Sequence, residues 1–103
     1  LPARQPKVAA QALLKRLNEI DECLRSSEIF ASYEFVGSSL LFAADDRGNA
    51  SVWLLDFGIT VPAAVPGGHL QHTVPWQQGN HEDGYLLGLS NLQRLWRRVV
   101  DEM

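Results

Sequence analysis

Apolar side chains recur every three or four positions along the first quarter of the chain. Between Lys7 and Leu24 they are Ala10, Leu13, Leu14, Leu17, Ile20 and Leu24, with Lys15, Arg16, Glu19 and Glu22 on the other side. This spacing predicts an amphipathic helix with one buried face. Pro6 suits its first turn, where the missing N–H needs no partner. Ser26–Ser27 followed by Glu28 then predicts a break and an N-cap for a short helix through Phe30.

The pattern changes to that of strands in the middle of the chain. Tyr33–Val36 and Leu40–Ala43 are apolar and aromatic runs, separated by the small residues Gly37–Ser39. Asp45–Asn49 has the composition of a turn, and Ser51–Phe57 is a second apolar run of strand-forming residues. Together these segments predict a β-hairpin, with Gly37–Ser39 at a bulge or a close backbone approach.

Breakers interrupt the pattern after Gly58, where the chain carries Pro62, Pro66, Gly67, Gly68, Pro75 and Gly79. This composition predicts a long loop rather than a regular element. From Glu82 onward an apolar stripe returns at helical spacing and consists of Tyr85, Leu89, Leu92, Trp96, Val99 and Val100. A final helix is therefore predicted. The order of helix, β-hairpin, long loop and C-terminal helix indicates an α+β fold.

Composition narrows the class of protein. The 103 residues include 9 basic and 12 acidic side chains, a net charge of −3, which gives no general attraction to nucleic acid or to an anionic membrane. The single cysteine, Cys23, cannot form an internal disulfide and is expected to be a small buried thiol. No apolar run is long enough for a membrane span and no signal pattern opens the chain, so a cytoplasmic protein is expected. Because the chain opens at Leu1 without a methionine and ends inside a helical pattern at Met103, we expect it to be a piece of a longer protein.

Asp56 is the leading candidate for chemistry, because it ends an apolar strand and is followed by Phe57 and Gly58. Protein kinases use an Asp-Phe-Gly triplet to hold the metal that binds the ATP phosphates. The alternative is an acidic residue that merely ends a strand. The Gly-rich loop, the Val-Ala-Ile-Lys strand and the His-Arg-Asp loop of protein kinases are all absent, which argues against an ordinary protein kinase. Ser38 and Ser39 can offer hydroxyls to a phosphate or to a metal-bound water, the alternative being small residues at a bulge.

Histidines in the loop raise the question of zinc. They are His69, His72 and His81. No second ligand pair of recognised spacing accompanies them, so solvated or hydrogen-bonded histidines are the default interpretation.

Three other features carry a structural and a functional interpretation each. Trp76 follows a proline and is expected to plug the loop onto the core rather than to contact a ligand. Asn80, Glu82 and Asp83 precede the last helix, where capping is at least as good an explanation as catalysis. The basic stretch Leu92–Val100 with its tryptophan has the outline of a calmodulin target, but its apolar stripe is expected to face the core of the chain itself.

Several motifs, taken together and in order, resemble a known family. They are Val36–Phe42 (V-G-S-S-L-L-F), Val52–Gly58 (V-W-L-L-D-F-G), Pro75–Trp76 and Gly79–Leu89 (G-N-H-E-D-G-Y-L-L-G-L). These match the C-terminal part of the inositol polyphosphate kinase family, with its inositol-trisphosphate 3-kinase branch the nearest. The resemblance runs from about Glu28 to Leu95.

The resemblance implies a fold, an activity and a set of roles. The fold is the C-terminal lobe segment of an inositol polyphosphate kinase, which is SAICAR synthase-like, and the activity is transfer of the ATP γ-phosphate to a hydroxyl of inositol trisphosphate or a related inositol phosphate. By the same resemblance Asp56 holds Mg²⁺, and Ser38 and Ser39 line the site of the ATP phosphates. Ile59 stands where relatives carry a lysine that contacts the substrate, and His81 stands where they usually carry arginine.

One family motif, Pro-x-x-x-Asp-x-Lys-x-Gly, is absent from residues 1–103, as are the ATP-clamping lysine and the adenine-contacting hinge. We therefore expect these residues to be the C-terminal segment of one kinase catalytic domain, with no catalytic residue of its own and no activity alone. The expected ligands of the full-length protein are ATP, Mg²⁺ and an inositol phosphate, and calmodulin is a candidate partner through regions outside this segment. The alternative is a kinase-derived binding or regulatory module that has lost catalysis.

Overall fold

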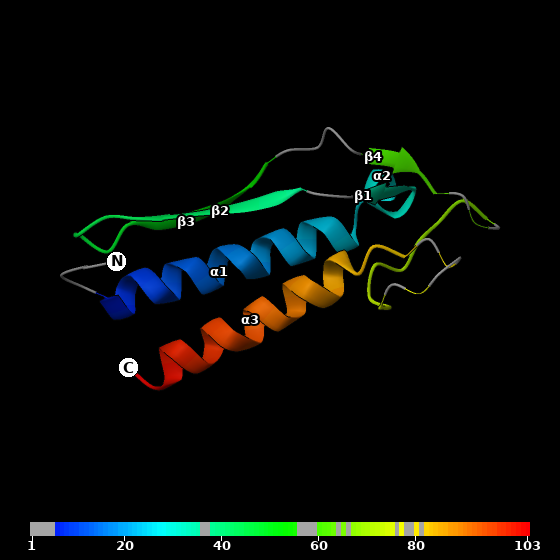
Figure 1. The fold of residues 1–103 in the computed structure, drawn as a ribbon. Helices are drawn as coiled ribbons and strands as arrows, with labels where there is room; N and C mark the ends of the chain where they lie inside the picture. The colour runs from blue at the N-terminus through cyan, green and yellow to red at the C-terminus, as the bar shows by residue number, and fades with distance from the viewer. Residues whose placement is uncertain are drawn as a thin grey trace.

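The structure is a computed structural model that describes residues 6–35, 38–55, 60–63, 65, 67–75, 77, 80 and 82–103. Its elements are α1 (Pro6–Arg25), α2 (Glu28–Ala31), β1 (Tyr33–Phe35), β2 (Ser39–Ala44), β3 (Ala50–Leu55), β4 (Thr60–Pro62) and α3 (Tyr85–Asp101). The predicted α+β class is confirmed. Two long helices, α1 and α3, lie side by side, and the β2–β3 hairpin covers α1 (Figure 1). The short elements α2, β1 and β4 gather at the end of the molecule opposite the two termini (Figure 1).

The core lies where α1 meets the hairpin and α3. The buried residues of α1 are Ala9, Ala10, Leu13, Leu14, Leu17 and Ile20. All but Ala9 were predicted from the periodicity, and the predicted Leu24 is partly buried. Leu17 and Val52 of β3 are both 0% exposed, and Leu86 and Leu89 of α3 complete the cluster. Arg16 spans the same interface, because its Nε donates to the Val52 carbonyl at 3.0 Å. Burial of this apolar stripe is the main stabilising contribution to the fold.

The turn of the hairpin is stabilised by hydrogen bonds among its own residues. The Asp45 carboxylate accepts hydrogen bonds from the backbone N–H groups of Arg47 and Asn49 and from the Asn49 side chain, each at 2.9 Å. Gly48 takes the left-handed conformation, with φ at 89°. These hydrogen bonds, the one from the Asn49 side chain above all, hold the pKa of Asp45 below its usual value despite the opposing effect of burial. The turn aligns β2 and β3 from Ala44 opposite Ala50 to Ser39 opposite Leu55.

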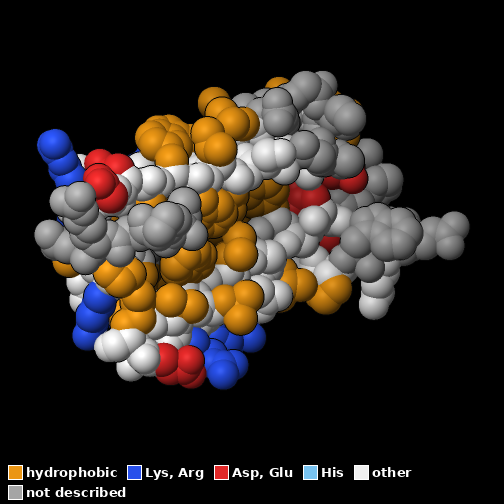
Figure 2. All heavy atoms as spheres, turned by 60° about the vertical axis from the view of Figure 1, so that its left-hand side comes forward, with side chains coloured by type: hydrophobic (Ala, Val, Ile, Leu, Met, Phe, Trp, Pro, Cys, Tyr) orange, Lys and Arg blue, Asp and Glu red, His pale blue; other side chains and the backbone are white. Residues whose placement is uncertain are grey.

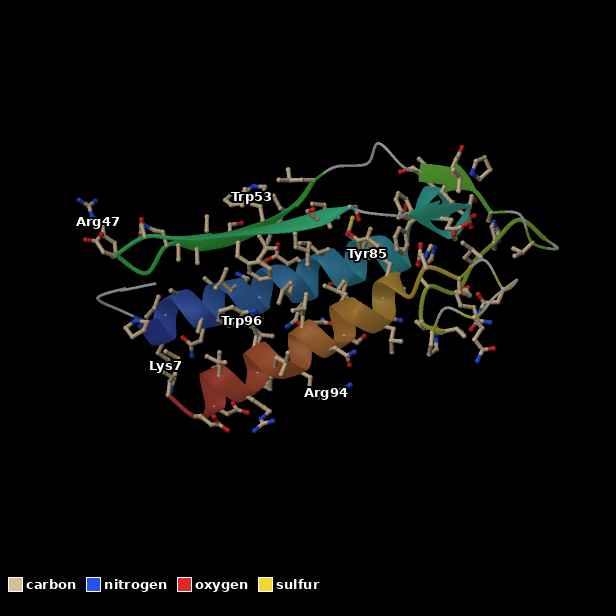
Figure 3. All side chains as sticks on the ribbon, in the orientation of Figure 1. Lys7, Arg47, Trp53, Tyr85, Arg94 and Trp96 are labelled. Carbon is tan, nitrogen blue, oxygen red and sulfur yellow. The ribbon has the colours of Figure 1, made fainter. Side chains whose placement is uncertain are left out.

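The two faces of the hairpin differ. Leu40 and Phe42 of β2 point inward, and Phe42 stacks on Trp96 of α3 at a centroid distance of 6.0 Å. Figure 3 shows Trp53 on the outer side of the hairpin and Trp96 between the hairpin and α3. Trp96 therefore faces the core, as the sequence predicted for the terminal helix, whereas Trp53 is 44% exposed. Figure 2 shows that hydrophobic side chains gather on this face of the molecule, with Lys, Arg, Asp and Glu side chains mostly toward its edges.

Two local predictions are wrong. The loop after Gly58 contains a short strand, β4, which pairs with β1; Pro62 is tolerated because it ends an edge strand opposite Tyr33. Cys23 is exposed rather than buried. The last helix begins at Tyr85, directly after Glu82, Asp83 and Gly84, which agrees with the prediction that Glu82 and Asp83 precede it.

Other boundaries agree closely with prediction. Ser27 caps α2 by accepting a hydrogen bond from the Phe30 N–H at 3.1 Å. Val36 and Phe57, the expected ends of two strands, lie outside the described residues. Across the described ranges, no helix is both long and apolar enough to cross a membrane.

Candidate functional site

Two short antiparallel ladders, β1–β4 and β2–β3, follow one another along the same two stretches of chain. The pairs that flank the junction between the ladders are Phe35 with Thr60, and Ser39 with Leu55. In the sequence, residues 36–38 lie between these pairs on one stretch and residues 56–59 on the other, and of these the structure describes Ser38 alone.

The described part of this junction contains both candidate serines. Ser38 comes just before β2 and Ser39 is its first residue. Ser39 is exposed, whereas the Ser38 hydroxyl oxygen is buried and has no hydrogen-bond partner within the described part of the chain. Ser38 also lines an open hollow of about 400 Å³ between β2 and α3, together with Tyr85. Asp56 and Ile59 lie outside the described residues, so their predicted roles stay predictions.

Tyr85 links Ser38 to the start of α3. Burial raises the pKa of the Tyr85 hydroxyl above 10.0, the neighbouring Ser38 side chain opposes this shift, and the negative charge of Asp83 adds to it. Tyr85 therefore stays neutral at physiological pH. Figure 3 shows its side chain between the hairpin and α3.

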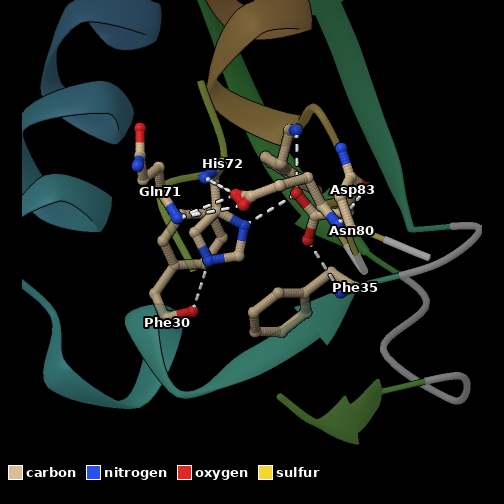
Figure 4. A network of polar contacts seen from close by, with 8 residues as sticks. Phe30, Phe35, Gln71, His72, Asn80 and Asp83 are labelled. Carbon is tan, nitrogen blue, oxygen red and sulfur yellow. Dashed lines mark hydrogen bonds and ion pairs between the residues drawn. The ribbon is translucent and has the colours of Figure 1, made fainter. Parts of the chain in front are cut away.

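Next to this junction the structure places a buried ion pair that the sequence did not predict. His72, 1% exposed, donates from Nδ1 to Asp83 Oδ1 at 2.7 Å and from Nε2 to the Phe30 carbonyl at 2.7 Å (Figure 4). A carbonyl and an ionised carboxylate can only accept hydrogen bonds, so both ring nitrogens must carry protons. His72 is therefore an imidazolium.

The pKa shifts of this pair agree with that assignment. Burial alone would lower the pKa of His72, but the hydrogen bond and charge of Asp83, helped by the Phe30 carbonyl and by Glu82, raise it above 6.5. Burial alone would raise the pKa of Asp83, but hydrogen bonds from His72 and from the N–H groups of Phe35 and Tyr85 lower it below 3.8. Each partner stabilises the charged form of the other.

The backbone of His72 is held as firmly as its ring. Glu82 Oε1 accepts from the N–H groups of Gln71 and His72 at 2.8 and 2.9 Å, and His72 itself has a positive φ of 62°. The His72 carbonyl accepts from the N–H groups of Leu86 and Leu87 at 2.8 and 3.1 Å, which caps the first turn of α3.

Capping by the residues before α3 is thus only partly as predicted. Asp83 Oδ1 accepts from the Tyr85 N–H at 2.9 Å and is a cap, whereas Glu82 binds the loop backbone instead. Asn80 holds the approach to this turn, because its side chain accepts from the Glu82 N–H and donates to the Pro75 carbonyl.

Aromatic rings enclose the ion pair. Phe30 stacks on the His72 ring at a centroid distance of 3.9 Å and on Phe35 at 5.0 Å, while Tyr85 meets Phe30 edge-on at 5.5 Å. Stacking of an imidazolium on an aromatic face is itself favourable. The enclosure keeps water away from the His72–Asp83 hydrogen bond and strengthens it.

The histidines behave differently from one another. For His72 the prediction of a hydrogen-bonded histidine is confirmed, and His69 makes an exposed contact with Glu28 at 3.3 Å. Among the residues that the structure describes, no group of three or more histidine, cysteine or acidic side chains could hold a metal ion. His81 and Trp76 lie outside the described residues. No spacing in the sequence marks His72 and Asp83 as partners, because the loop between them has no regular period.

Comparison with known proteins adds an independent observation. A model of the inositol polyphosphate kinase family matches residues 2–97. The chain belongs to the inositol polyphosphate kinase family. It is 54% identical over 80 residues to inositol-trisphosphate 3-kinase A of Homo sapiens, a match that covers 77% of this chain and 17% of that protein.

Two further family members show the same pattern. Inositol-trisphosphate 3-kinase B of Homo sapiens is 54% identical over 78 residues, 75% of this chain and 8% of that protein. The inositol-trisphosphate 3-kinase homolog of Caenorhabditis elegans is 40% identical over 92 residues, 88% of this chain and 18% of that protein. The family resemblance seen in the motifs is confirmed, and the chain spans less than a fifth of the length of these relatives.

Proposed function

We propose that this chain supplies the ATP-phosphate side of the site in an inositol-phosphate kinase, which moves the γ-phosphate of ATP to a hydroxyl of inositol trisphosphate or a related inositol phosphate. The observation that carries this proposal is the register of the hairpin. Ser39 lies opposite Leu55 in the last described pair of the hairpin. Ser38 directly precedes Ser39 in the chain and Asp56 directly follows Leu55, so the candidate serines and the candidate aspartate adjoin the same residue pair. Family membership and the names of the relatives support the same activity.

One described residue, Ser38, supports a phosphate site. Its hydroxyl is buried beside the Tyr85 side chain and makes no hydrogen bond of good geometry within the described ranges, so a ligand or water there would complete its hydrogen bonding. Mg²⁺ prefers oxygen ligands, and Asp56 is the carboxylate that would hold it. When bound, Mg²⁺ neutralises negative charge on the ATP phosphates. Ser38 and Ser39 would orient phosphate oxygens or a metal-bound water.

The decisive experiment removes the charge of Asp56 in the full-length protein. We expect Asp56→Asn to lower ATP-dependent phosphorylation of inositol trisphosphate by at least about 100-fold, because the carboxylate holds the metal that stabilises the transferring phosphate. Asp45→Asn is the matched control, since Asp45 closes the exposed turn at the far end of the hairpin, and it should retain activity. Activity of Asp56→Asn within about twofold of wild type would show that the metal role is wrong.

One departure favours a second function. Ile59 replaces the lysine that the family resemblance assigns to substrate contact, and loss of that cation fits a regulatory module that no longer phosphorylates inositol phosphates. The two functions are separated by the wild-type full-length protein itself. Mg²⁺-dependent ATP binding with turnover supports the kinase, and absence of turnover with the protein folded supports the module.

A further inference from the structure

We propose that His72 is a positioning residue for the ATP-phosphate side of the site: its ring holds Asp83, and Asp83 holds the backbone that leads to Ser38. This role rests on the proposed function, because it concerns where Ser38 lies relative to the ATP phosphates. His72 is neither beside the predicted metal ligand in sequence nor a residue of the hairpin. It acts through contacts that the structure makes between α2, β1 and the start of α3 (Figure 4).

The first connection runs through β1. Asp83 Oδ2 accepts from the Phe35 N–H at 2.9 Å, and Phe35 is the last residue of β1, three positions before Ser38. The other edge of Phe35 faces Thr60 in β4. Asp83 therefore fastens the strand at the point where the chain enters the junction between the two ladders.

The second connection runs through α3. Asp83 Oδ1 accepts from the Tyr85 N–H at 2.9 Å, and the Tyr85 side chain lies beside Ser38 in the hollow between β2 and α3. One carboxylate thus fixes both the backbone before Ser38 and the aromatic residue next to it. A displacement of Asp83 would move both.

His72 decides the orientation of Asp83. Its Nδ1–H is the side-chain donor on Asp83 Oδ1, and the Nε2–H bond to the Phe30 carbonyl prevents the ring from turning. Two other ionisable residues lie nearby: Glu82, which binds the His72 backbone N–H, and Tyr85, whose hydroxyl interacts with the charge of Asp83. Neither provides a donor to Asp83 Oδ1 from its side chain, so no other described side chain is seen to replace His72 in this contact.

Two substitutions of His72 in the full-length protein separate its hydrogen bond to Asp83 from its hydrogen bond to the Phe30 carbonyl. Asn reproduces the position of Nδ1, can donate to Asp83, and tolerates the positive φ of this residue, whereas Gln reproduces the reach of Nε2 toward Phe30. His69→Gln is the matched control, because His69 is exposed in the same loop. KM for MgATP, KM for inositol trisphosphate, kcat and the melting temperature are measured for each variant, with the assay below every melting temperature.

We expect His72→Gln to raise KM for MgATP about tenfold, with KM for inositol trisphosphate changed less than about twofold. His72→Asn should stay within about threefold of wild type for MgATP, and His69→Gln should match wild type. A His72→Gln variant that is folded and has an unchanged KM for MgATP overturns the positioning role. So does equal impairment of His72→Gln and His72→Asn, because donation to Asp83 would then not matter.

Asp83→Asn provides a second route to the same answer if His72→Gln melts below the assay temperature. A folded Asp83→Asn variant should show the same selective rise in KM for MgATP. If both variants are unfolded at the assay temperature, the ion pair is structural only and the positioning role is overturned. A wild-type full-length protein without kinase activity contradicts the proposed function itself, whereas active wild type with unaltered variants contradicts the positioning role alone.

Discussion

Replacing Asp83 with asparagine should make local opening of the contact between β1 and the start of α3 easier. The Asp83 carboxylate accepts from the His72 ring at 2.7 Å and from the Phe35 and Tyr85 N–H groups at 2.9 Å each. Asparagine has one oxygen, so its NH₂ group must face at least one of these donors. It also leaves the charge of His72 without its counterion.

The magnitude follows from burial. The side chains of His72 and Asp83 are 2% and 3% exposed, so water cannot replace the lost contacts. A hydrogen bond to a charged group contributes about 1.5–3 kcal/mol, and breaking a buried ion pair by removing one partner costs about 3–5 kcal/mol. We expect a loss of about 3–5 kcal/mol in the free energy of opening this region, with the lower end reached if His72 loses its proton.

Native-state hydrogen exchange in the full-length protein measures this directly. If the Phe35 and Tyr85 amides exchange through local opening, a loss of about 3 kcal/mol or more corresponds to exchange that is at least about 150-fold faster. Asp21→Asn is the matched control: Asp21 pairs with Arg25 one helical turn away at 3.0 Å on the surface, and its loss should cost only about 0.5 kcal/mol. Exchange in Asp83→Asn within about twofold of wild type would refute the buried ion pair.

Three further predictions concern pH, substrate and backbone. Because folding raises the pKa of His72, the contribution of His72 to the stability of the fold is complete below pH 6.5 and declines as pH rises through the folded pKa. Because folding lowers the pKa of Asp83, the contribution of Asp83 is complete above pH 3.8 and is lost as pH falls through the folded pKa. The difference in melting temperature between wild type and Asp83→Asn should therefore be largest between these two values and shrink in alkaline buffer. Ile59→Lys should tighten binding of inositol trisphosphate in calorimetric titration, because it adds a cation to a polyanion site, and an equal or weaker affinity would contradict the carried-over substrate contact. Gly84→Ala should lower the free energy of unfolding by about 1–2 kcal/mol, because φ is 67° at this position. A Cβ has room there, since its nearest neighbour is the Val74 carbonyl oxygen at 3.8 Å, so the cost comes from the backbone conformation. Gly84→Asn should cost less, because asparagine tolerates a positive φ, and equal costs for the two variants would show that φ is not the cause.

Local patterns in the sequence predicted most of the elements because their causes are local. The apolar stripe of α1 and the Ser27 cap of α2 depend on residues within one or two helical turns. The turn at Asp45 likewise depends on neighbours only, so the hairpin follows from a short stretch of chain. The ordered motifs also identified the family, which the comparison confirms.

Only the tertiary structure decided the environment of the candidate site. The His72 ring reaches a carbonyl 42 residues earlier in the chain, and Asp83 reaches an N–H group 48 residues earlier. β4 exists because β1 offers it an edge, although Thr60–Pro62 by itself has little strand signal. A histidine in a breaker-rich loop has no period or partner spacing to show that it will be buried and charged. Its state is determined by acceptors that folding brings around it, which is why the sequence alone predicted Ser38 and Ser39 as site residues but not the ion pair beside them.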